Sequence, residues 1–145
     1  MSTIRIVASL IALTGILSGF VSIGAAEEIP VLIVHPDIAV DALTRTEVKK
    51  IFLGNKSRWP DNQRIQFVTL KNGAAHDAFV REYVEKTPSQ FTIYWKKMVF
   101  TGRGRMPPTL AGPEDVVDFV ARTPGAVGYV PESTADETVK IVGIP

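Results

Sequence analysis

Two short stretches constrain the fold of this chain more than any others. The first, residues 51–62, reads IFLGNKSRWPDN, so an apolar helix end runs into Gly54 and then into a polar loop. The second, residues 123–130, reads TPGAVGYV, in which Pro-Gly interrupts a helical pattern and the apolar run 126–130 follows. Glycine after a helical segment is a stop signal, and Pro-Gly marks a turn. The pair predicts a docked helix end, an anchored turn and a buried strand.

Six residues of these stretches are assigned a structural role and not a catalytic or ligand-binding one. An isolated glycine in a strand indicates that another group packs close to the backbone, so we expect a tight contact at Gly128. Trp59, in a loop beside a proline, either plugs the edge of the core or projects toward a partner. The assigned residues are Phe52, Gly54, Trp59, Gly125, Gly128 and Tyr129.

Apolar runs that suit strands alternate with segments of helical periodicity along residues 31–142. The run 31–34 is continuous and mostly β-branched, which is typical of a central strand buried on both faces. Further strands are expected at 64–70, 126–130 and 138–142, and helices at 45–53, 74–85, 87–99 and from 112 to about 122, with a loop over 100–111. This order predicts an α/β domain with a mixed or mainly parallel sheet flanked by helices.

Aromatic side chains form a stripe on the expected helix 87–99. Phe91, Tyr94 and Trp95 recur at helical spacing, and Phe100 follows them. Such a stripe could line a ligand groove, but large aromatic side chains at this spacing usually supply core area. We therefore interpret all four as core.

The first 26 residues predict a secretory signal peptide. Arg5 is the one charged residue among them, and the segment ends in Gly-Ala-Ala before the acidic pair at 27–28. This combination predicts cleavage after Ala26, export to the periplasm or the medium, and a domain over 27–145 with no membrane span of its own. The alternative is a retained membrane anchor, because the apolar run is about long enough to span a bilayer.

Charge and cysteine content exclude several classes of function. Removal of the first 26 of 145 residues leaves 119, enough for one small domain, and lowers Lys plus Arg from 16 to 15, against 15 acidic residues. A net charge of zero argues against a nucleic-acid-binding protein. The chain has no cysteine, so neither disulfides nor thiolate chemistry contribute.

The titratable residues do not form a catalytic or metal-binding pattern. His35 and His76 lie in different segments and in no metal-ligand spacing, and we expect each to face solvent or to cap a turn. The pairs 27–28 and 114–115 are adjacent acids, which suit a solvated terminus and a helix start better than a catalytic dyad. We expect no catalytic residue, no metal and no cofactor, and therefore not an enzyme.

The two stretches also carry a family resemblance. With residues 79–84, 94–95 and 100–102 between them, they resemble the phosphate-binding-protein-like branch of the type II periplasmic binding proteins. The likeness is to small proteins that accompany or resemble the solute receptor of the phosphate ABC importer, and it extends over 31–130. It implies one receptor-like lobe, a phosphate-like ligand, an ABC permease or another envelope protein as partner, and a core plug at Trp59.

An anion site is expected where the second strand leads through Gly73 into a helix. A helix start presents unpaired backbone N–H groups at the positive end of the dipole. The expected ligand-binding residues at this junction are Thr69, Asn72, Gly73 and His76. In the phosphate receptors the corresponding turn carries an arginine and a Ser-Gly-Thr-type run, whereas here no hydroxyl follows Thr69 before His76.

The loop 101–105 offers a second group of anion-binding side chains. Arg103 and Arg105 alternate with glycines, and guanidinium groups suit phosphate or carboxylate. We include both in the expected ligand site, while a solvated mobile loop remains the alternative.

Two functions stay open at this stage. The first is an exported protein that binds phosphate or another oxyanion as part of, or as a relative of, a phosphate ABC import system. The second is a protein-interaction or assembly module of the cell envelope that retains the receptor fold without the ligand.

Overall fold

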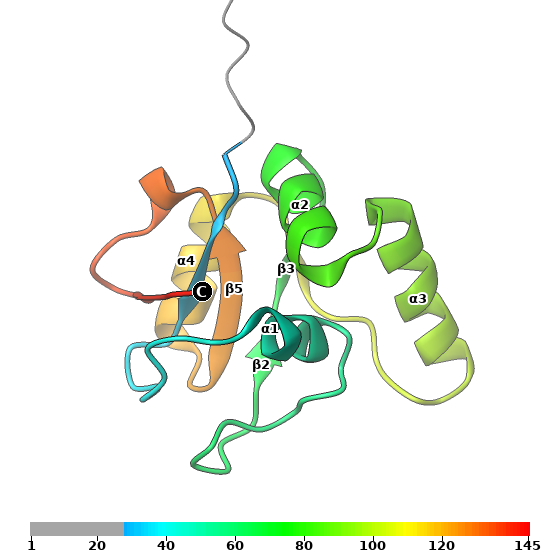
Figure 1. Cartoon of the computed structure of the whole chain (residues 1–145), viewed down its shortest axis with the longest axis horizontal. Helices are drawn as coiled ribbons and strands as arrows, with labels where there is room; N and C mark the ends of the chain where they lie inside the picture. Colours follow the sequence, from blue (N-terminus) through cyan, green and yellow to red (C-terminus); the bar gives the residue numbers. More distant parts are fainter. Residues whose placement is uncertain (1–27) are drawn as a thin grey trace, which may run out of the picture.

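The apolar run 31–34 forms β1 (Val31–Val34) inside a four-stranded sheet in the computed structural model, which describes residues 28–145 (Figure 1). The strand order is β2 (Gln66–Phe67), β5 (Ala126–Val130), β1, β6 (Lys140–Val142). β1 is antiparallel to both of its neighbours, and β2 runs parallel to β5. The expected mixed sheet, with β1 as an inner strand, is confirmed.

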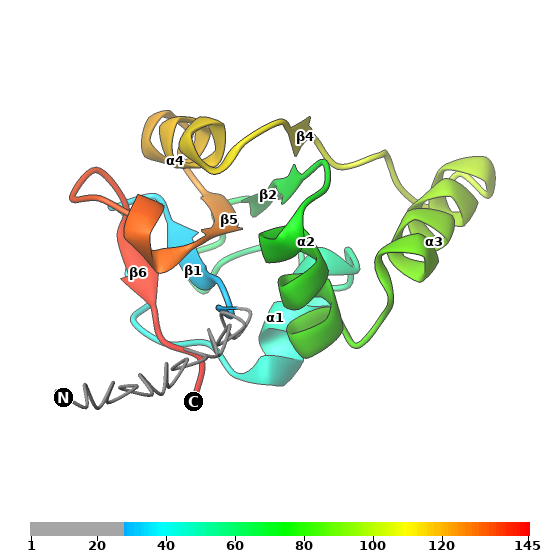
Figure 2. The same ribbon diagram turned by 90° about the horizontal axis from the view of Figure 1, so that it is seen from above.

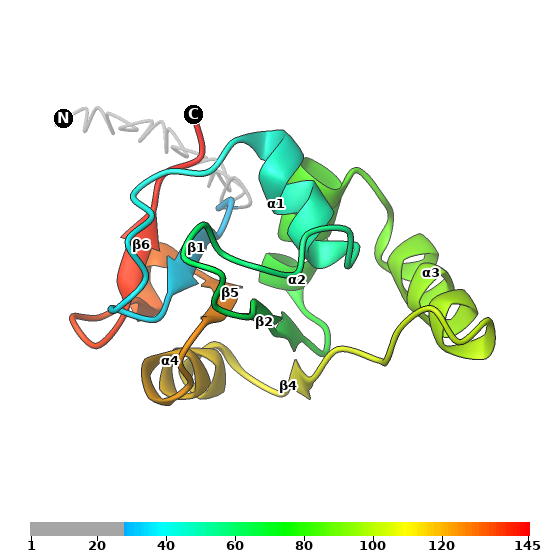
Figure 3. The same cartoon turned by 90° about the horizontal axis from the view of Figure 1, so that it is seen from below.

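Helices cover both faces of this sheet, which gives three layers. Figures 2 and 3 show α4 (Pro113–Arg122) on one side of the strands and α1 (Arg45–Phe52) with α2 (Ala74–Phe79) on the other. All five residues of β5 are buried. Successive side chains of a strand point to opposite faces, so β5 contributes alternately to the two halves of the core. The expected α/β domain with flanking helices is confirmed.

Gly128 of β5 faces α4 at close range. A Cβ atom at this position would lie 2.7 Å from Val116 Cγ1 and 3.2 Å from Val68 Cγ2. Both distances are shorter than ordinary van der Waals contact, so the helix packs directly on the strand backbone. The expected close contact at Gly128 is confirmed.

The two stretches that constrain the sequence contact each other. Trp59 is buried, and its Nε1 donates a hydrogen bond to the carbonyl oxygen of Gly125 at 3.0 Å. The backbone N–H of Gln66 donates to the same oxygen, also at 3.0 Å. Trp59 is therefore a core plug, as the resemblance implies, and it fixes the loop 53–65 to the start of β5.

The expected single strand over 64–70 is wrong, because the structure divides it at Val68. Gln66–Phe67 pair with β5, whereas β3 (Thr69–Leu70) pairs in parallel with β4 (Thr109–Leu110) in a separate two-stranded sheet. β4 also corrects the expected loop over 100–111. The apolar periodicity is continuous through both segments, and periodicity does not reveal which strand each segment pairs with.

The helix α2 continues into a wider π-helical turn, η1 (Val80–Val84), and ends at Glu85, whose φ is +59°. α3 (Pro88–Phe100) follows after a capping box in which Thr87 Oγ1 accepts from the backbone of Gln90. The starts of the helices expected at 45–53 and 87–99 are confirmed, and Thr44 and Thr87 cap them through their side chains. The chain ends with the short turn η2 (Glu132–Thr134) and β6.

The aromatic stripe of α3 is core on one side only. Trp95 is buried, and its Nε1 donates a hydrogen bond to the carbonyl oxygen of Phe52 at 3.2 Å. The hydroxyl of Tyr94 donates a hydrogen bond to the carbonyl oxygen of Leu53 at 2.6 Å. These bonds attach α3 to the C-terminal end of α1, where Gly54 has a positive φ of +76°. Phe100, in contrast, is 91% exposed. The interpretation of Phe100 as core is wrong, because it follows Trp95 by five residues and so lies on another face of the helix.

The expected signal peptide, 1–26, lies outside the described residues. Between residues 28 and 145, no helix combines the length and the apolar character needed to cross a bilayer.

Candidate functional site

The junction between β3 and α2 places several polar groups at one pocket. Gly73 begins α2 with φ +107° and no side-chain cap, and nothing lies within 4 Å of the position that a Cβ would take. Glycine is thus needed there for the backbone conformation and not for space. The first backbone bond of the helix runs from the N–H of Asp77 to the carbonyl oxygen of Gly73. The preceding N–H groups at the start of the helix have no partner within the helix itself.

The pocket lies between the starts of α2 and α3 and has a volume of about 420 Å³. Its polar lining comes from three segments that the fold brings together: the β3–α2 turn, the first turn of α2 and the first turns of α3. The lining residues are Lys71, Asn72, His76, Asp77, Pro88, Ser89, Thr92 and Ile93.

His76 is the buried polar side chain of this pocket, and a hydrogen-bond chain holds it. Its Nδ1 lies 2.6 Å from the hydroxyl oxygen of Tyr129, and that oxygen accepts from the backbone N–H of Leu70 at 3.1 Å. Phe79 stacks on the Tyr129 ring, with centroids 3.9 Å apart and an angle of 6° between the planes. The central strand β5 therefore fixes the imidazole at the start of α2.

The hydrogen-bond chain also assigns the tautomer of His76. Burial raises the pKa of the Tyr129 phenol, so its hydroxyl keeps its proton. Among the described residues, Nδ1 of His76 is the one acceptor within hydrogen-bond distance of the Tyr129 hydroxyl, so we infer that the phenol donates its proton to Nδ1. Burial lowers the pKa of His76, with the neighbouring Asp77 acting weakly in the opposite direction. The neutral ring consequently carries its proton on Nε2.

Nε2 of His76 is directed to the surface of the pocket. Within residues 28–145, every buried side-chain nitrogen or oxygen has a hydrogen-bond partner. The bond to Tyr129 occupies Nδ1, and no group of residues 28–145 bonds Nε2. Nε2 is therefore accessible, and the pocket that His76 lines is where it can donate a hydrogen bond.

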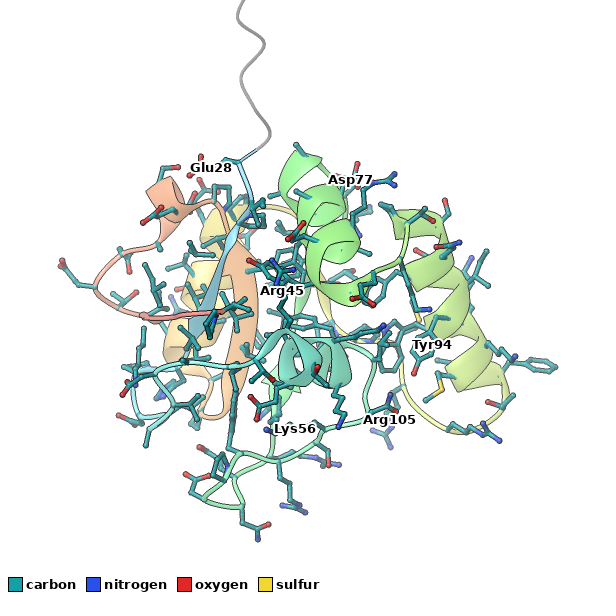
Figure 4. All side chains as sticks on the ribbon, viewed as in Figure 1. Glu28, Arg45, Lys56, Asp77, Tyr94 and Arg105 are labelled. Atoms are coloured by element: carbon teal, nitrogen blue, oxygen red, sulfur yellow. The ribbon has the colours of Figure 1, made fainter. Side chains whose placement is uncertain are left out.

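Charges in the pocket are balanced. Lys71 supplies a cation and Asp77 a carboxylate, the one acid among the described residues that line it. Figure 4 shows Asp77 on the side of α2 that faces α3. A carboxylate repels a bound anion, whereas the ammonium group, the amide of Asn72 and Nε2–H of His76 attract it. The arrangement can accept a small anion through directed donors, without a strong excess of positive charge.

The structure brings together some of the expected site residues and separates others. Asn72 and His76 line the pocket and Gly73 lies between them, whereas Thr69 is buried in β3 and is not among the lining residues. Arg103 and Arg105 follow the C-terminal end of α3, roughly 20 Å along the helix from the pocket at its start. Figure 4 shows Asp77 near the top of the view and Arg105 in the lower half, near Lys56. The junction and the arginine loop therefore do not form one site.

The expectation that both histidines face solvent or cap a turn is half right. Nδ1 of His35 accepts from the backbone N–H of Asp37 at 3.2 Å, which is a turn cap. His76 is buried and bonded to Tyr129, so the expectation is wrong there. Residues 28–145 contain no group of three or more His, Cys, Asp or Glu side chains that could hold a metal ion.

Burial of neutral His76 predicts a loss of stability as the pH falls below about 6.5. The unfolded chain protonates this histidine near its ordinary pKa of 6.5, while the folded chain, with a lowered pKa, does so only at lower pH. In that window the unfolded state binds more protons, so the free energy of unfolding decreases with falling pH, by at most about 1.4 kcal/mol per pH unit.

Urea titrations at several pH values from 7.5 to about 5 test this prediction, since the carboxylates titrate mainly below that range. His76→Gln is expected to flatten the profile. An unchanged slope in this variant would contradict the assignment.

No protein-family model matches the sequence, and no curated protein matches it. Several solved structures match the fold. One is described as a phosphate ABC transporter substrate-binding protein from Clostridium perfringens with bound phosphate, with a TM-score of 0.63 and 23% identity over 81% of this chain and 46% of that one. An ABC-type phosphate transport receptor from Vibrio cholerae has a TM-score of 0.56 and 16% identity, over 79% of this chain and 45% of that one.

A third match, PstS from Borrelia burgdorferi, has a TM-score of 0.59 and 15% identity over 81% of this chain and 47% of that one. The chain has the fold of part of a phosphate receptor. It spans less than half the length of these receptors. At such identities the likeness establishes the receptor fold and not the ligand.

Several residues of the pocket were not expected from the sequence. Lys71, Ser89 and Thr92 line it, and Tyr129, which we assigned to the scaffold alone, also orients His76. Lys71 adjoins the expected junction and could have been included. Ser89 and Thr92 reach the pocket only because α3 starts beside α2, and no local sequence pattern predicts that these two helix starts are neighbours.

Proposed function

We propose that this protein binds a small oxyanion of the phosphate class in the pocket between α2 and α3. One observation carries the proposal: a buried, oriented imidazole presents an unpartnered Nε2–H beside Asn72 and Lys71 in a single pocket. Gly73 lets the backbone enter the helix there. The fold supports the ligand class, since a protein that shares it was solved with bound phosphate.

The donors of the pocket set the expected strength of binding. The lining offers the ammonium group of Lys71, the amide of Asn72, Nε2–H of His76 and two hydroxyls, those of Ser89 and Thr92. A buried anion needs most of its oxygens satisfied. Because Asp77 opposes the anion and the pocket contains no arginine, we propose weak, readily reversible binding rather than tight capture.

The same fold supports a proposal for the wider role. We propose a non-catalytic protein of the periplasm or another exported compartment, acting with or derived from a phosphate ABC import system. The receptors of that fold are named as transport components. A permease of that system is the proposed partner.

Thermal unfolding with added phosphate and sulfate tests ligand binding. A ligand that binds only the folded state raises the Tm, and a concentration 100 times the Kd stabilises by about 2.7 kcal/mol. We expect a rise with phosphate that Asn72→Ala and His76→Gln each reduce. Asp77→Asn is expected to enlarge it, because it removes the opposing carboxylate.

Matched variants separate a local effect from a change in net charge. Glu137→Gln removes an exposed acid outside the pocket and is expected to leave the phosphate effect unchanged. Arg103→Ala with Arg105→Ala should also leave it unchanged, because these residues lie beyond the other end of α3. If no oxyanion raises the Tm even of the Asp77→Asn variant, ligand capture is refuted.

The second candidate is a protein-interaction module that keeps the receptor fold without the ligand. The described pocket is lined by the carboxylate of Asp77 and by no arginine, which favours this alternative. It predicts no oxyanion effect together with a stable complex with one specific envelope protein. A monomer that forms no such complex would contradict it.

A further inference from the structure

The solvent side of α3 carries exposed apolar side chains. Residues three, four and seven apart lie on one face of a helix, so Ile93, Lys96, Lys97 and Phe100 share a face, opposite the buried Trp95. Phe100 is 91% exposed and Ile93 64%. Two further apolar side chains near the end of the helix, Val99 and Met106, are exposed by 43% and 48%. We call residues 96–106, which do not line the pocket, the α3 end.

The α3 end is also basic throughout. It contains Lys96, Lys97, Arg103 and Arg105 and no acidic residue. Among residues 28–145, none of these four cations takes part in an ion pair, whereas five of the other basic side chains bridge a carboxylate. Six of the ten unpaired Lys and Arg side chains of residues 28–145 lie elsewhere, but the α3 end combines the other four with Phe100, the most exposed of the large apolar side chains.

The position of α3 makes this surface accessible. Figures 1 and 2 show α3 at one end of the molecule, beyond α2 and away from the four-stranded sheet. Trp95 and Tyr94 attach its inner side to the end of α1. The backbone N–H of Arg103 bonds to the carbonyl oxygen of Met98 at 2.9 Å, which folds the loop back against the helix. The α3 end therefore lies at one end of the molecule, with its inner side attached to α1 and the loop bonded back to the helix.

We propose that the α3 end docks on an anionic lipid bilayer surface. A projecting aromatic side chain beside several cations fits the bilayer interface, where the ring enters the boundary of the acyl region and the cations stay among anionic head groups. The complete absence of acids favours a surface of uniform negative charge over a protein surface, where charges of both signs alternate. The inference goes beyond oxyanion binding, because the α3 end lies at the far end of the helix from the pocket.

Sedimentation with lipid vesicles tests the proposal. The protein and its variants are expressed in a bacterium and purified from the compartment to which the bacterium delivers them. Mass spectrometry verifies that all of them have the same N-terminus. The parent protein is expected to bind phosphatidylcholine vesicles that contain phosphatidylglycerol far better than vesicles of phosphatidylcholine alone. Binding should weaken as salt is raised, because exposed charges are screened.

Variants with matched controls assign the binding to the α3 end. Lys96→Gln with Lys97→Gln is expected to weaken vesicle binding about 30-fold, and Phe100→Ser about tenfold. Arg64→Gln with Arg81→Gln removes the same charge from exposed positions elsewhere, and Ile141→Ser replaces an apolar side chain that is 48% exposed on β6. We expect both controls to bind nearly as the parent does.

Three results would overturn the proposal. The first is equal binding to neutral and anionic vesicles, and the second is equal loss in the test and control variants. The third is no vesicle binding together with a self-association that Phe100→Ser abolishes, because the α3 end would then be an interface between copies of this chain.

Discussion

Replacement of Gly125 by alanine is expected to lower the free energy of unfolding by about 3 kcal/mol or more. Gly125 has φ +79°, and a Cβ there would lie 2.2 Å from the carbonyl oxygen of Arg64. Backbone atoms cannot rotate away as a side chain can, so the loop or β5 has to shift. Either shift also strains the two hydrogen bonds that the Gly125 oxygen accepts from Trp59 and Gln66.

Gly102 provides the matched control for this substitution. Its φ is +70°, close to that of Gly125, but nothing lies within 4 Å of the position of its Cβ. Gly102→Ala should therefore lower the free energy of unfolding only by the cost of a positive φ in alanine, about 1 to 2 kcal/mol. Urea unfolding of both variants separates the two contributions. Equal losses at the two positions would show that the close approach to Arg64 adds nothing.

The scaffold could be predicted from the sequence because its signals are local. Gly125 follows a proline at the end of a helical pattern, and Gly128 interrupts an apolar strand pattern. At both positions a Cβ atom would lie very close to another atom, so only glycine fits without a shift. The capping box at Thr44 is also a local signal, because it involves only Thr44 and Glu47, three residues further on. Around Val68, the local pattern correctly predicts extended backbone. It does not reveal that the residues before and after Val68 pair with different strands.

The candidate site could be predicted only in part, for the same reason. Asn72, Gly73 and His76 are close in sequence and share one turn, so a strand–glycine–helix pattern locates them. Ser89 enters the pocket because α3 packs beside α2, and that packing depends on the contact of Trp95 with Phe52, which is distant in the sequence. Arg103 was grouped with the junction by its chemistry alone, and the length of α3 keeps the two apart.

The two proposed surfaces divide the roles of α3. Its first turns line the pocket with Ser89 and Thr92, while its last turn presents Phe100 and Lys97 to solvent. A ligand site at one end and a docking surface at the other can act independently, because the buried Trp95 holds the middle of the helix on α1. At constant ionic strength, phosphate should therefore not alter vesicle binding, and vesicles should not alter the effect of phosphate on the Tm.

The second large effect is expected from Tyr129→Phe, which removes one oxygen atom from the core. The Tyr129 hydroxyl accepts from the N–H of Leu70 and donates to Nδ1 of His76. Without it, two buried polar groups lose their partner, and each such loss destabilises by about 1 to 3 kcal/mol. The ring itself stays, so its stacking on Phe79 is kept. We expect a total loss of roughly 2 to 6 kcal/mol in the free energy of unfolding.

Tyr83→Phe is the matched control, since Tyr83 is only half-buried and its hydroxyl forms no hydrogen bond within residues 28–145. It should change stability by no more than about 0.5 kcal/mol. The double variant His76→Leu with Tyr129→Phe removes both ends of one bond, so its loss should be smaller than the sum of the two single losses by about 1 kcal/mol. Additive losses would refute the hydrogen-bond chain.

The same substitution connects the core to the proposed ligand. With the phenol gone, nothing directs the proton of His76 to Nε2, and the imidazole is free to turn or to adopt the other tautomer. The pocket then loses its oriented donor although Asn72 and Lys71 remain. Tyr129→Phe, a buried change that touches no ligand, should therefore reduce the phosphate-induced rise in Tm, whereas Tyr83→Phe should leave that rise intact. An undiminished rise in Tyr129→Phe would show that His76 does not donate to the anion.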